Sequence, residues 1–141
     1  MEQRISLITL GVADLARSRA FYEALGWRRG ARKAEGVAFF QLGGLVLSLW
    51  TRAELAKETG LPLDSPGPYP FSLAHNVRTC REVDGVLKEA VSCGGKIVTP
   101  ATEKSWGGYS GYFSDPDFYL WEVAFNPGFA ILDDGSISLP Q

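Results

Sequence analysis

The chain contains the same predicted order of elements twice, and this internal duplication constrains its fold more than any other feature. Each half reads as a strand, a helix and three further strands. Aligning the halves places Val12 on Val77 and Ser48 on Glu122, with small insertions. A repeat of about 65 to 75 residues is too long for a solenoid unit and indicates two paired modules. The expected fold class is therefore α+β, built from two βαβββ modules.

The first half carries local signals for each of these elements. "RISLITLGV" is rich in β-branched residues and favours a strand. Asp14 can cap a helix from about Leu15 to Leu25 that Gly26 ends. "VAFFQLGGLVLSLW" predicts two strands joined by a two-residue turn at 43–44, and "TRAE" has capping-box spacing for a short helix. The buried stripe of the long helix is expected at Ala20, Phe21, Ala24 and Leu25.

The second half repeats this plan with its own signals. "FSLAHNV" predicts a strand, and Thr79 with Glu82 has capping-box spacing for a helix to about Ser92. "GGKIV" predicts a further strand, and "GYFSDPDFYLWEVAF" predicts a closing hairpin in which Pro116 suits the second turn position. The buried stripe of this helix is expected at Val83, Val86, Leu87, Ala90 and Val91.

The module boundaries follow from the proline content. "GLPLDSPGPYP" holds four of the eight prolines, which remove backbone donors and favour extended chain. We therefore expect one domain over residues 1–128, with module 1 at about 4–59, a linker at 60–70 and module 2 at about 71–128. Residues 129–141 are expected to form a C-terminal extension.

Charge and hydropathy exclude several classes of partner. The chain carries 14 basic and 16 acidic residues, a net charge of −2, without long runs of either sign. This balance does not favour nucleic acid or an anionic membrane. No apolar stretch approaches the roughly 20 residues of a membrane span, and the start lacks a signal peptide's features. We expect a cytoplasmic protein with a small-molecule ligand, and we interpret the arginines of "WRRGARK" as a solvated face.

Three segments make the chain resemble the vicinal oxygen chelate superfamily, the group of glyoxalase I, bleomycin-binding proteins, fosfomycin-modifying enzymes and extradiol dioxygenases. They are "GVADLARSRAFYEALGW", "GGKIVTPA" and, most specifically, "WGGYSGYFSDPDFYLWEVAFNP". The likeness covers nearly all of residues 4–128. It implies two βαβββ modules whose curved mixed sheets form a cup, with the chemistry inside the cup and commonly in a homodimer.

The residues at the family's metal-binding positions predict no metal site. Metal-dependent members draw ligands, most often histidines and glutamates, from four inward strand positions, which the resemblance places at Leu7, Ser48, Ser72 and Glu122. One carboxylate and two hydroxyls without imidazole make a poor site for a first-row metal. The single histidine, His75, lies three residues from Ser72 and is expected on the opposite face of its strand. We therefore expect no metal and no other cofactor.

Glu122 is the polar residue that most requires an explanation, because it lies among Leu120, Trp121 and Val123. Strand alternation puts Glu122 on the inward face. An apolar pocket with a few polar groups is typical of a small-molecule site. The other candidate ligand-binding residues are Leu7, Thr9, Ser48, Trp50, Ser72, Trp106, Tyr109 and Tyr112. The alternative interpretation is that the aromatic residues fill an ordinary core and that Glu122 is a hydrogen-bonded remnant of an ancestral metal site.

Two functional classes stay open. In the first, the protein is a metal-independent lyase or isomerase of glyoxalase-like type, and Glu122 is the catalytic base that removes a proton next to a carbonyl group. In the second, it is a non-catalytic protein that sequesters an aromatic or cationic small molecule, as bleomycin-binding relatives do. We favour the first class, with the substrate unassigned.

Phe118 departs from the family pattern. Relatives usually have glycine directly after the "DPD" triplet, where this chain has Phe118. If the turn keeps its usual shape, Phe118 must adopt a left-handed backbone conformation that costs an L-residue about 1–2 kcal/mol. Either the turn has shifted, or packing of the ring offsets this cost.

Overall fold

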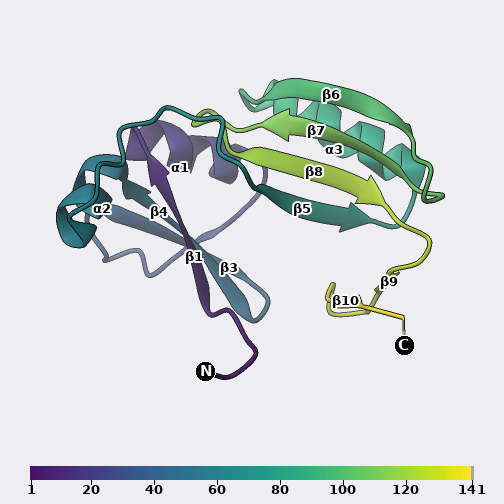
Figure 1. The fold of residues 1–141 in the computed structure, drawn as a ribbon, viewed down its shortest axis with the longest axis horizontal. Helices are drawn as coiled ribbons and strands as arrows, with labels where there is room; N and C mark the ends of the chain where they lie inside the picture. The colour runs from purple at the N-terminus through teal and green to yellow at the C-terminus, as the bar shows by residue number, and fades with distance from the viewer. Residues whose placement is uncertain (141) are drawn as a thin grey trace. The chain divides into compact units, whose positions relative to one another are not determined.

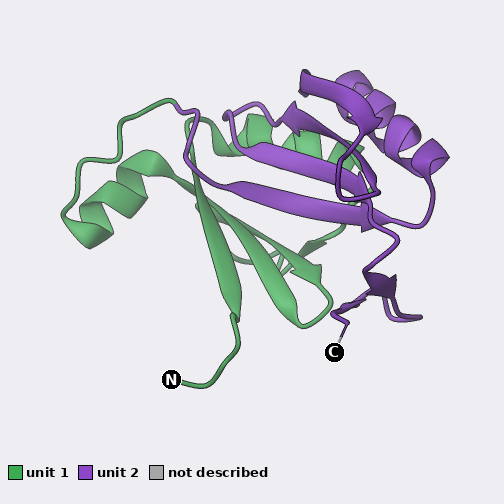
Figure 2. Ribbon diagram, turned by 45° about the vertical axis from the view of Figure 1, so that its right-hand side comes forward, with its two compact units in different colours: residues 1–66 green, residues 67–141 purple. Residues whose placement is uncertain are grey.

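The structure, a computed structural model, describes residues 1–140 as two compact units (Figure 2). The first unit is Met1–Pro66 and the second begins at Gly67. The division falls inside the proline-rich segment 60–70, and each unit contains one of the two modules.

The first unit is a four-stranded mixed sheet with two helices (Figure 1). The strand order is β1-β4-β3-β2, with β1 parallel to β4 and the other neighbours antiparallel. The elements, in chain order, are β1 (Leu7–Val12), α1 (Leu15–Ala24), β2 (Arg29–Gly30), β3 (Val37–Leu42), β4 (Leu45–Thr51) and α2 (Arg52–Thr59).

The second unit repeats this topology, with strand order β5-β8-β7-β6 and β5 parallel to β8. Figure 1 shows α3 lying along one face of its sheet, where the helix contacts all four strands. The predicted α+β class and the two βαβββ modules are therefore confirmed. The elements are β5 (Ser72–Val77), α3 (Cys80–Ser92), β6 (Lys96–Glu103), β7 (Tyr109–Ser114), β8 (Leu120–Phe125), β9 (Ala130–Ile131) and β10 (Ile137–Ser138).

The predicted helix caps are present. The Asp14 carboxylate accepts from the backbone N–H of Arg17 at 3.0 Å, and the Thr51 hydroxyl accepts from that of Glu54 at 3.3 Å. The Thr79 hydroxyl accepts from the backbone N–H of Glu82 at 3.2 Å. These bonds satisfy donors that have no partner within a helix. None of the helices among residues 1–140 has the length and apolar character needed to cross a bilayer.

The two helices that cover the sheets bury different kinds of residue. The α3 stripe is confirmed at Val83, Leu87 and Ala90, although Val91 is exposed. The predicted α1 stripe is wrong in part, because α1 buries Ser18 and Tyr22 beside the predicted Phe21 in place of the expected alanines. Ala20 and Ala24 are exposed, whereas Ser18, Phe21 and Tyr22 are buried.

An aromatic cluster explains how α1 is turned. Tyr22 meets Trp27 and Phe40 at ring-centroid distances of 5.1 and 5.8 Å, and Trp27 lies 5.9 Å from Phe40. Aromatic pairs at such distances add attraction beyond the burial of their area. Burying Tyr22 in this cluster rotates the two small alanines of α1 toward solvent.

The β7–β8 hairpin keeps the turn that the "DPD" triplet predicts. The backbone N–H of Phe118 donates to the Asp115 carbonyl at 3.1 Å, and the Asp115 carboxylate accepts from the N–H groups of Asp117 and Tyr119 at 2.9 Å each. Phe118 has φ 68°, so it adopts the expected left-handed conformation. Its side chain is 46% exposed.

Candidate functional site

Glu122 lies on the face of the second sheet that α3 does not cover. In register, Glu122 pairs with Ala74 of β5 on one side and with Tyr112 of β7 on the other. Residues that pair in register share one face of a sheet. The neighbours of Glu122 on β8, Trp121 and Val123, are buried and point to the α3 side. Glu122 and Tyr112 are half-buried, whereas Ala74 is exposed and Ala124 is buried.

Tyr112 and Glu122 are cross-strand neighbours, and together they form the main polar feature of this face. Burial raises the pKa of the Tyr112 phenol, and the charge of Glu122 and a hydrogen bond with its carboxylate raise it further. The phenol therefore keeps its proton at neutral pH and can donate a hydrogen bond to the carboxylate. A carboxylate has about four lone-pair sites, so this bond leaves Glu122 able to accept a further proton or hydrogen bond.

Ser110 is a polar residue of the same face that the sequence analysis missed. Ser110 pairs with Ala124 of β8 and is 1% exposed. Within the described chain its Oγ has no hydrogen-bond partner. A buried polar atom without a partner is rare in native proteins and calls for an explanation. Its position two residues from Tyr112 in one strand is the sequence signal that could have identified it.

Tyr109 does not join this face, contrary to the expectation that it lines the same wall as Tyr112. Three residues separate the two tyrosines, so strand alternation sends their side chains to opposite faces. Tyr109 pairs with Phe125 on the α3 side, and its hydroxyl donates to the Asp84 carboxylate of α3 at 2.9 Å. This hydrogen bond connects β7 to α3.

Trp106 lies in the β6–β7 loop and is 49% exposed. Its ring occupies the space that a side chain at Gly108 would need, and a Cβ there would also stand 2.6 Å from the Phe125 carbonyl oxygen. The absence of a side chain at Gly108 thus lets the indole lie against the end of β7. Ser72, at the start of β5, is exposed and pairs with Leu120 on the face that carries Glu122.

The four candidate residues of the first unit share one face of their own sheet. Thr9 pairs with Ser48, and the positions of Leu7 and Trp50 follow by alternation. This face is opposite to the one that α1 covers, where Leu47 and Leu49 are buried. Ser48 is 3% exposed, whereas Leu7 is exposed and the other two are half-buried.

His75 lies on the α3 side of the second sheet, as expected. It pairs with Val123, so its imidazole is on the opposite face of β5 from Ala74. Partial burial lowers the pKa of His75 below its usual value, and the nearby Glu82 carboxylate opposes this shift. His75 therefore provides no base or ligand on the Glu122 face.

Comparison with known families identifies the group to which this arrangement belongs. A sequence model of the Glyoxalase/Bleomycin resistance protein/Dioxygenase superfamily matches residues 4–123. The chain belongs to this superfamily. No curated protein matches the chain.

Solved structures with the same superfamily fold include one of high similarity. A glyoxalase-related enzyme from Fulvimarina pelagi is 38% identical, covers 99% of this chain and 100% of its own, and has a TM-score of 0.91. A glyoxalase/bleomycin resistance protein/dioxygenase from Nocardioides is 25% identical over 91% and 87% of the two chains, with a TM-score of 0.74. Lactoylglutathione lyase from Agrobacterium tumefaciens shares the fold at 20% identity, 88% and 94% coverage and a TM-score of 0.64.

The side chains at the superfamily's ligand positions do not fit a divalent metal. Leu7 has no donor atom, Ser48 and Ser72 offer only hydroxyls, and Glu122 is the one carboxylate. Over residues 1–140, no three histidine, cysteine, aspartate or glutamate side chains gather so that they could hold an ion. Hydroxyls are weak ligands for first-row metals, so this donor set supplies no step that runs through a metal.

Proposed function

We propose that this member of the superfamily is a metal-independent, glyoxalase-like lyase or isomerase that acts on a small carbonyl compound, with Glu122 as the general base. The observation that carries the proposal is the Tyr112–Glu122 pair on the face that α3 leaves uncovered. A carboxylate held by a protonated phenol has a fixed orientation and retains acceptor capacity toward a ligand.

Each step of the proposed reaction balances without a cofactor. The Glu122 carboxylate takes a proton from the carbon next to the carbonyl group, and the electron pair of the broken C–H bond forms an enolate. In an elimination, the enolate re-forms the carbonyl group as the bond between the β-carbon and a leaving group breaks, and the carboxylic acid of Glu122 gives its proton to the departing group. In an isomerisation of an α-hydroxy carbonyl compound, the hydroxyl proton moves to the enolate oxygen, a carbonyl group forms at the carbon that carried the hydroxyl, and the carboxylic acid protonates the former carbonyl carbon. The Tyr112 hydroxyl stays hydrogen-bonded to the base throughout and keeps it in position.

The comparisons support an enzymatic activity of this class in general terms. The Fulvimarina pelagi relative is described as a glyoxalase-related enzyme, and one structural neighbour is a lactoylglutathione lyase. The second of these resembles the chain in fold alone, so it supports the architecture and does not identify a substrate.

Replacing the carboxylate with an amide tests the proposal. Glu122→Gln keeps the shape and one acceptor but cannot take up the proton, so turnover of a small keto substrate should fall roughly 100-fold or more while affinity is kept. Glu89→Gln, an exposed position on α3, is the matched control and should leave turnover unchanged. A screen of small keto compounds with the purified protein supplies the substrate. Equal turnover in both variants would contradict the role of Glu122.

The half-exposed ring of Trp106 favours a second candidate function, the sequestration of an aromatic or cationic small molecule. An exposed indole can stack on a flat ligand or lie against a cation. In that case Trp106→Ala weakens binding by about 1 kcal/mol or more, and Glu122→Gln affects only cationic ligands. Calorimetry with aromatic antibiotics separates this function from the enzymatic one.

A further inference from the structure

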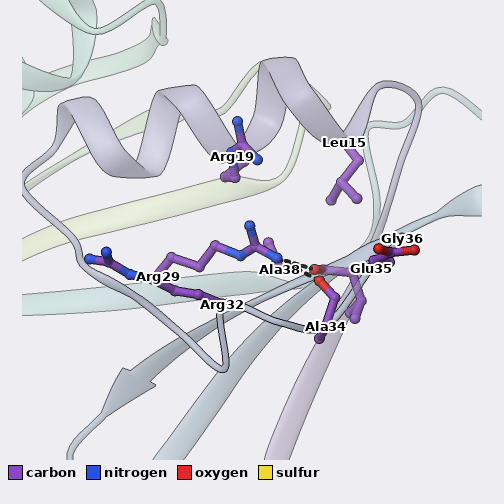
Figure 3. A pocket seen from close by; sticks show the side chains of 9 residues that line it. Leu15, Arg19, Arg29, Arg32, Ala34, Glu35, Gly36 and Ala38 are labelled. Atoms are coloured by element: carbon purple, nitrogen blue, oxygen red, sulfur yellow. Dashed lines mark hydrogen bonds between the residues drawn. The ribbon is translucent and has the colours of Figure 1, made fainter.

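Three arginines line a pocket in the first unit, and two of them, Arg29 and Arg32, come from the segment "WRRGARK" (Figure 3). The pocket has a volume of about 280 Å³ and lies between α1 and the segment that runs from β2 into β3. We call it the arginine pocket, after the three arginines that line it with Ala34, Glu35 and Ala38: Arg19, Arg29 and Arg32.

The arginine pocket is on the α1 side of the first sheet. Arg29 pairs in register with Phe40, and Ala38 pairs with Leu49. Phe40 and Leu49 are buried beneath α1, so Arg29 and Ala38 are on the same side of the sheet. Thr9 and Ser48 are on the other face of this sheet. The pocket is therefore separate from the candidate ligand-binding residues of the first unit.

Positive charge dominates the arginine pocket, although the whole chain has a net charge of −2. Its lining contains three guanidinium groups and one carboxylate, that of Glu35. A neighbouring hollow of about 390 Å³ shares Arg29 and Arg32 and adds Arg28 and Glu23. An anion that enters this region therefore meets an excess of positive charge at short range.

The contacts within the protein leave the charge of these guanidinium groups largely uncompensated. Arg29 donates to the backbone carbonyls of Ala34 at 2.6 Å and Val37 at 3.4 Å, which hold the group in place but are neutral. Arg19 lies 3.6 Å from the Glu23 carboxylate, in a pair whose side chains are both about two-fifths exposed. Such a pair at the surface is weak.

Two buried Nε donors of the arginine pocket make no hydrogen bond within the described part of the chain, although that of Arg19 is the atom that lies 3.6 Å from the Glu23 carboxylate. Across residues 1–140, the Nε atoms of Arg19 and Arg29 are buried and make no hydrogen bond. Leaving a buried charged donor unsatisfied is costly, so such a site favours a ligand that can accept its protons. Both atoms belong to residues that line one pocket, and each guanidinium group carries further donors beside its Nε atom.

We propose that the arginine pocket binds an oxyanion, the phosphate or carboxylate group of a small molecule. Guanidinium forks match the geometry of both groups and bind them through paired, charge-assisted hydrogen bonds. The volume admits such a group with a short attached chain. The Glu35 carboxylate at the rim disfavours crowding by several anions and limits occupancy to one.

Calorimetric titration of the full chain at low ionic strength tests this assignment, with inorganic phosphate and citrate as separate probes. One site per chain is expected, and Arg32→Gln should weaken binding roughly 10-fold through loss of a charged hydrogen bond. Arg32 is exposed, so this variant should fold. Arg19→Gln is a second variant on a different element and should act in the same direction. Whether phosphate or citrate binds more tightly identifies the chemical source of the oxyanion.

Two controls make the result decisive. Arg81→Gln removes the same charge from an exposed position on α3 and should leave binding unchanged, as should Glu122→Gln. Equal weakening by Arg81→Gln, or equal heats from sodium chloride at matched ionic strength, would reduce the effect to general charge screening and overturn the proposal. Failure of both probes to bind at millimolar concentration would also overturn it, whatever the outcome for the Glu122 reaction.

Discussion

The two modules have the same topology but carry their polar chemistry on opposite faces of their sheets. Ser48 and Glu122 are equivalent, because each is on the strand that pairs in parallel with the first strand of its module. Ser48 is a buried hydroxyl between Thr9 and Phe39, whereas Glu122 is a half-buried carboxylate beside a tyrosine. In the first module the charged groups instead gather on the α1 side, in the arginine pocket.

This difference indicates how a duplicated fold can carry different side chains at equivalent positions. The strand order is equivalent in both copies, and a polar side chain caps the long helix of each, Asp14 in one and Thr79 in the other. The residues that pair in register can then differ without changing the topology, since each replacement alters one position on one face. Three pairs of equivalent positions test this comparison. They are Ala38 with Gly111, the β3–β4 turn with the β7–β8 turn, and Leu10 with His75.

The largest effect is expected where one module has lost a side chain. Gly111 of β7 is equivalent to Ala38 of β3, since they pair with Val123 and Leu49 respectively. A Cβ at Gly111 would stand 2.8 Å from the Ala101 nitrogen and 2.8 Å from a Leu87 methyl carbon, so backbone must shift. Gly111→Ala should reduce the free energy of unfolding by about 1–3 kcal/mol, measured by denaturant titration.

Gly44→Ala is the matched control, because a Cβ there meets no atom within 4 Å. It should change stability by no more than a few tenths of a kcal/mol in either direction. If Gly111→Ala is as stable as this control, β6 and β7 are more loosely packed than the structure indicates. The position of Gly111 then has room for a side chain, as the equivalent position of Ala38 does.

A smaller effect is expected at the hairpin turns. The β3–β4 turn has glycine at its positive-φ position, Gly43 with φ 60°, whereas the β7–β8 turn has Phe118 with φ 68°. Phe118→Gly removes a conformational cost of about 1–2 kcal/mol but adds freedom to the unfolded chain worth about 0.4–1 kcal/mol. The variant should therefore be neutral or stabilising by up to about 1 kcal/mol in thermal unfolding.

Phe118→Ala separates the backbone from the ring. Alanine keeps the left-handed cost and removes the same aromatic contacts, so the difference between the alanine and glycine variants measures backbone strain less the added freedom of glycine in the unfolded chain. A loss above about 2 kcal/mol in both variants would instead indicate that the ring makes packing contacts of core strength.

Local chemical signals in the sequence predicted most of the fold. Asp14, Thr51 and Thr79 each cap a helix through an atom three residues away, so short spacing was sufficient. Placing Glu122 and His75 on opposite faces needed only strand alternation. The same rule, applied to Tyr109 and Tyr112, would have separated them, so that error was in the use of the rule.

Features that depend on contacts between distant residues were not predicted. The orientation of α1 follows from Tyr22 meeting Phe40, which is 18 positions further along and on another element. The arginine pocket needs Arg19 on α1 and Arg29 on β2 to converge, and a charge run read along the chain resembles a solvated face. Tertiary packing determines the orientation of α1 and the arginine pocket, and neither feature produces a periodic pattern in the sequence.

The smallest expected effect concerns the pH dependence of stability, at a position where one module has a leucine and the other a histidine. Leu10 and His75 are equivalent, because they pair with Leu49 and Val123. Leu10 is buried, whereas burial of His75 is partial and lowers the pKa of its imidazole, against the opposing charge of Glu82. A histidine whose pKa is lower in the folded state does not reduce the free energy of unfolding while it is neutral. It reduces this free energy at a pH low enough to protonate the unfolded state. The loss of stability therefore begins as the pH falls through the unfolded value of about 6.5 and is complete below the folded value.

Denaturant midpoints at about pH 7.5 and about pH 5.5 measure this effect, since the carboxylates titrate mainly at lower pH. His75 is the single histidine of the chain, so no other imidazole contributes. The wild-type protein should lose more stability between these two values than His75→Gln, which cannot take up a proton, and His75→Leu should follow His75→Gln. Acid could instead stabilise the wild type relative to both variants. That result would mean that the attraction of the Glu82 carboxylate for the charged imidazole exceeds the cost of its burial, and that the first turn of α3 holds His75 as a cation.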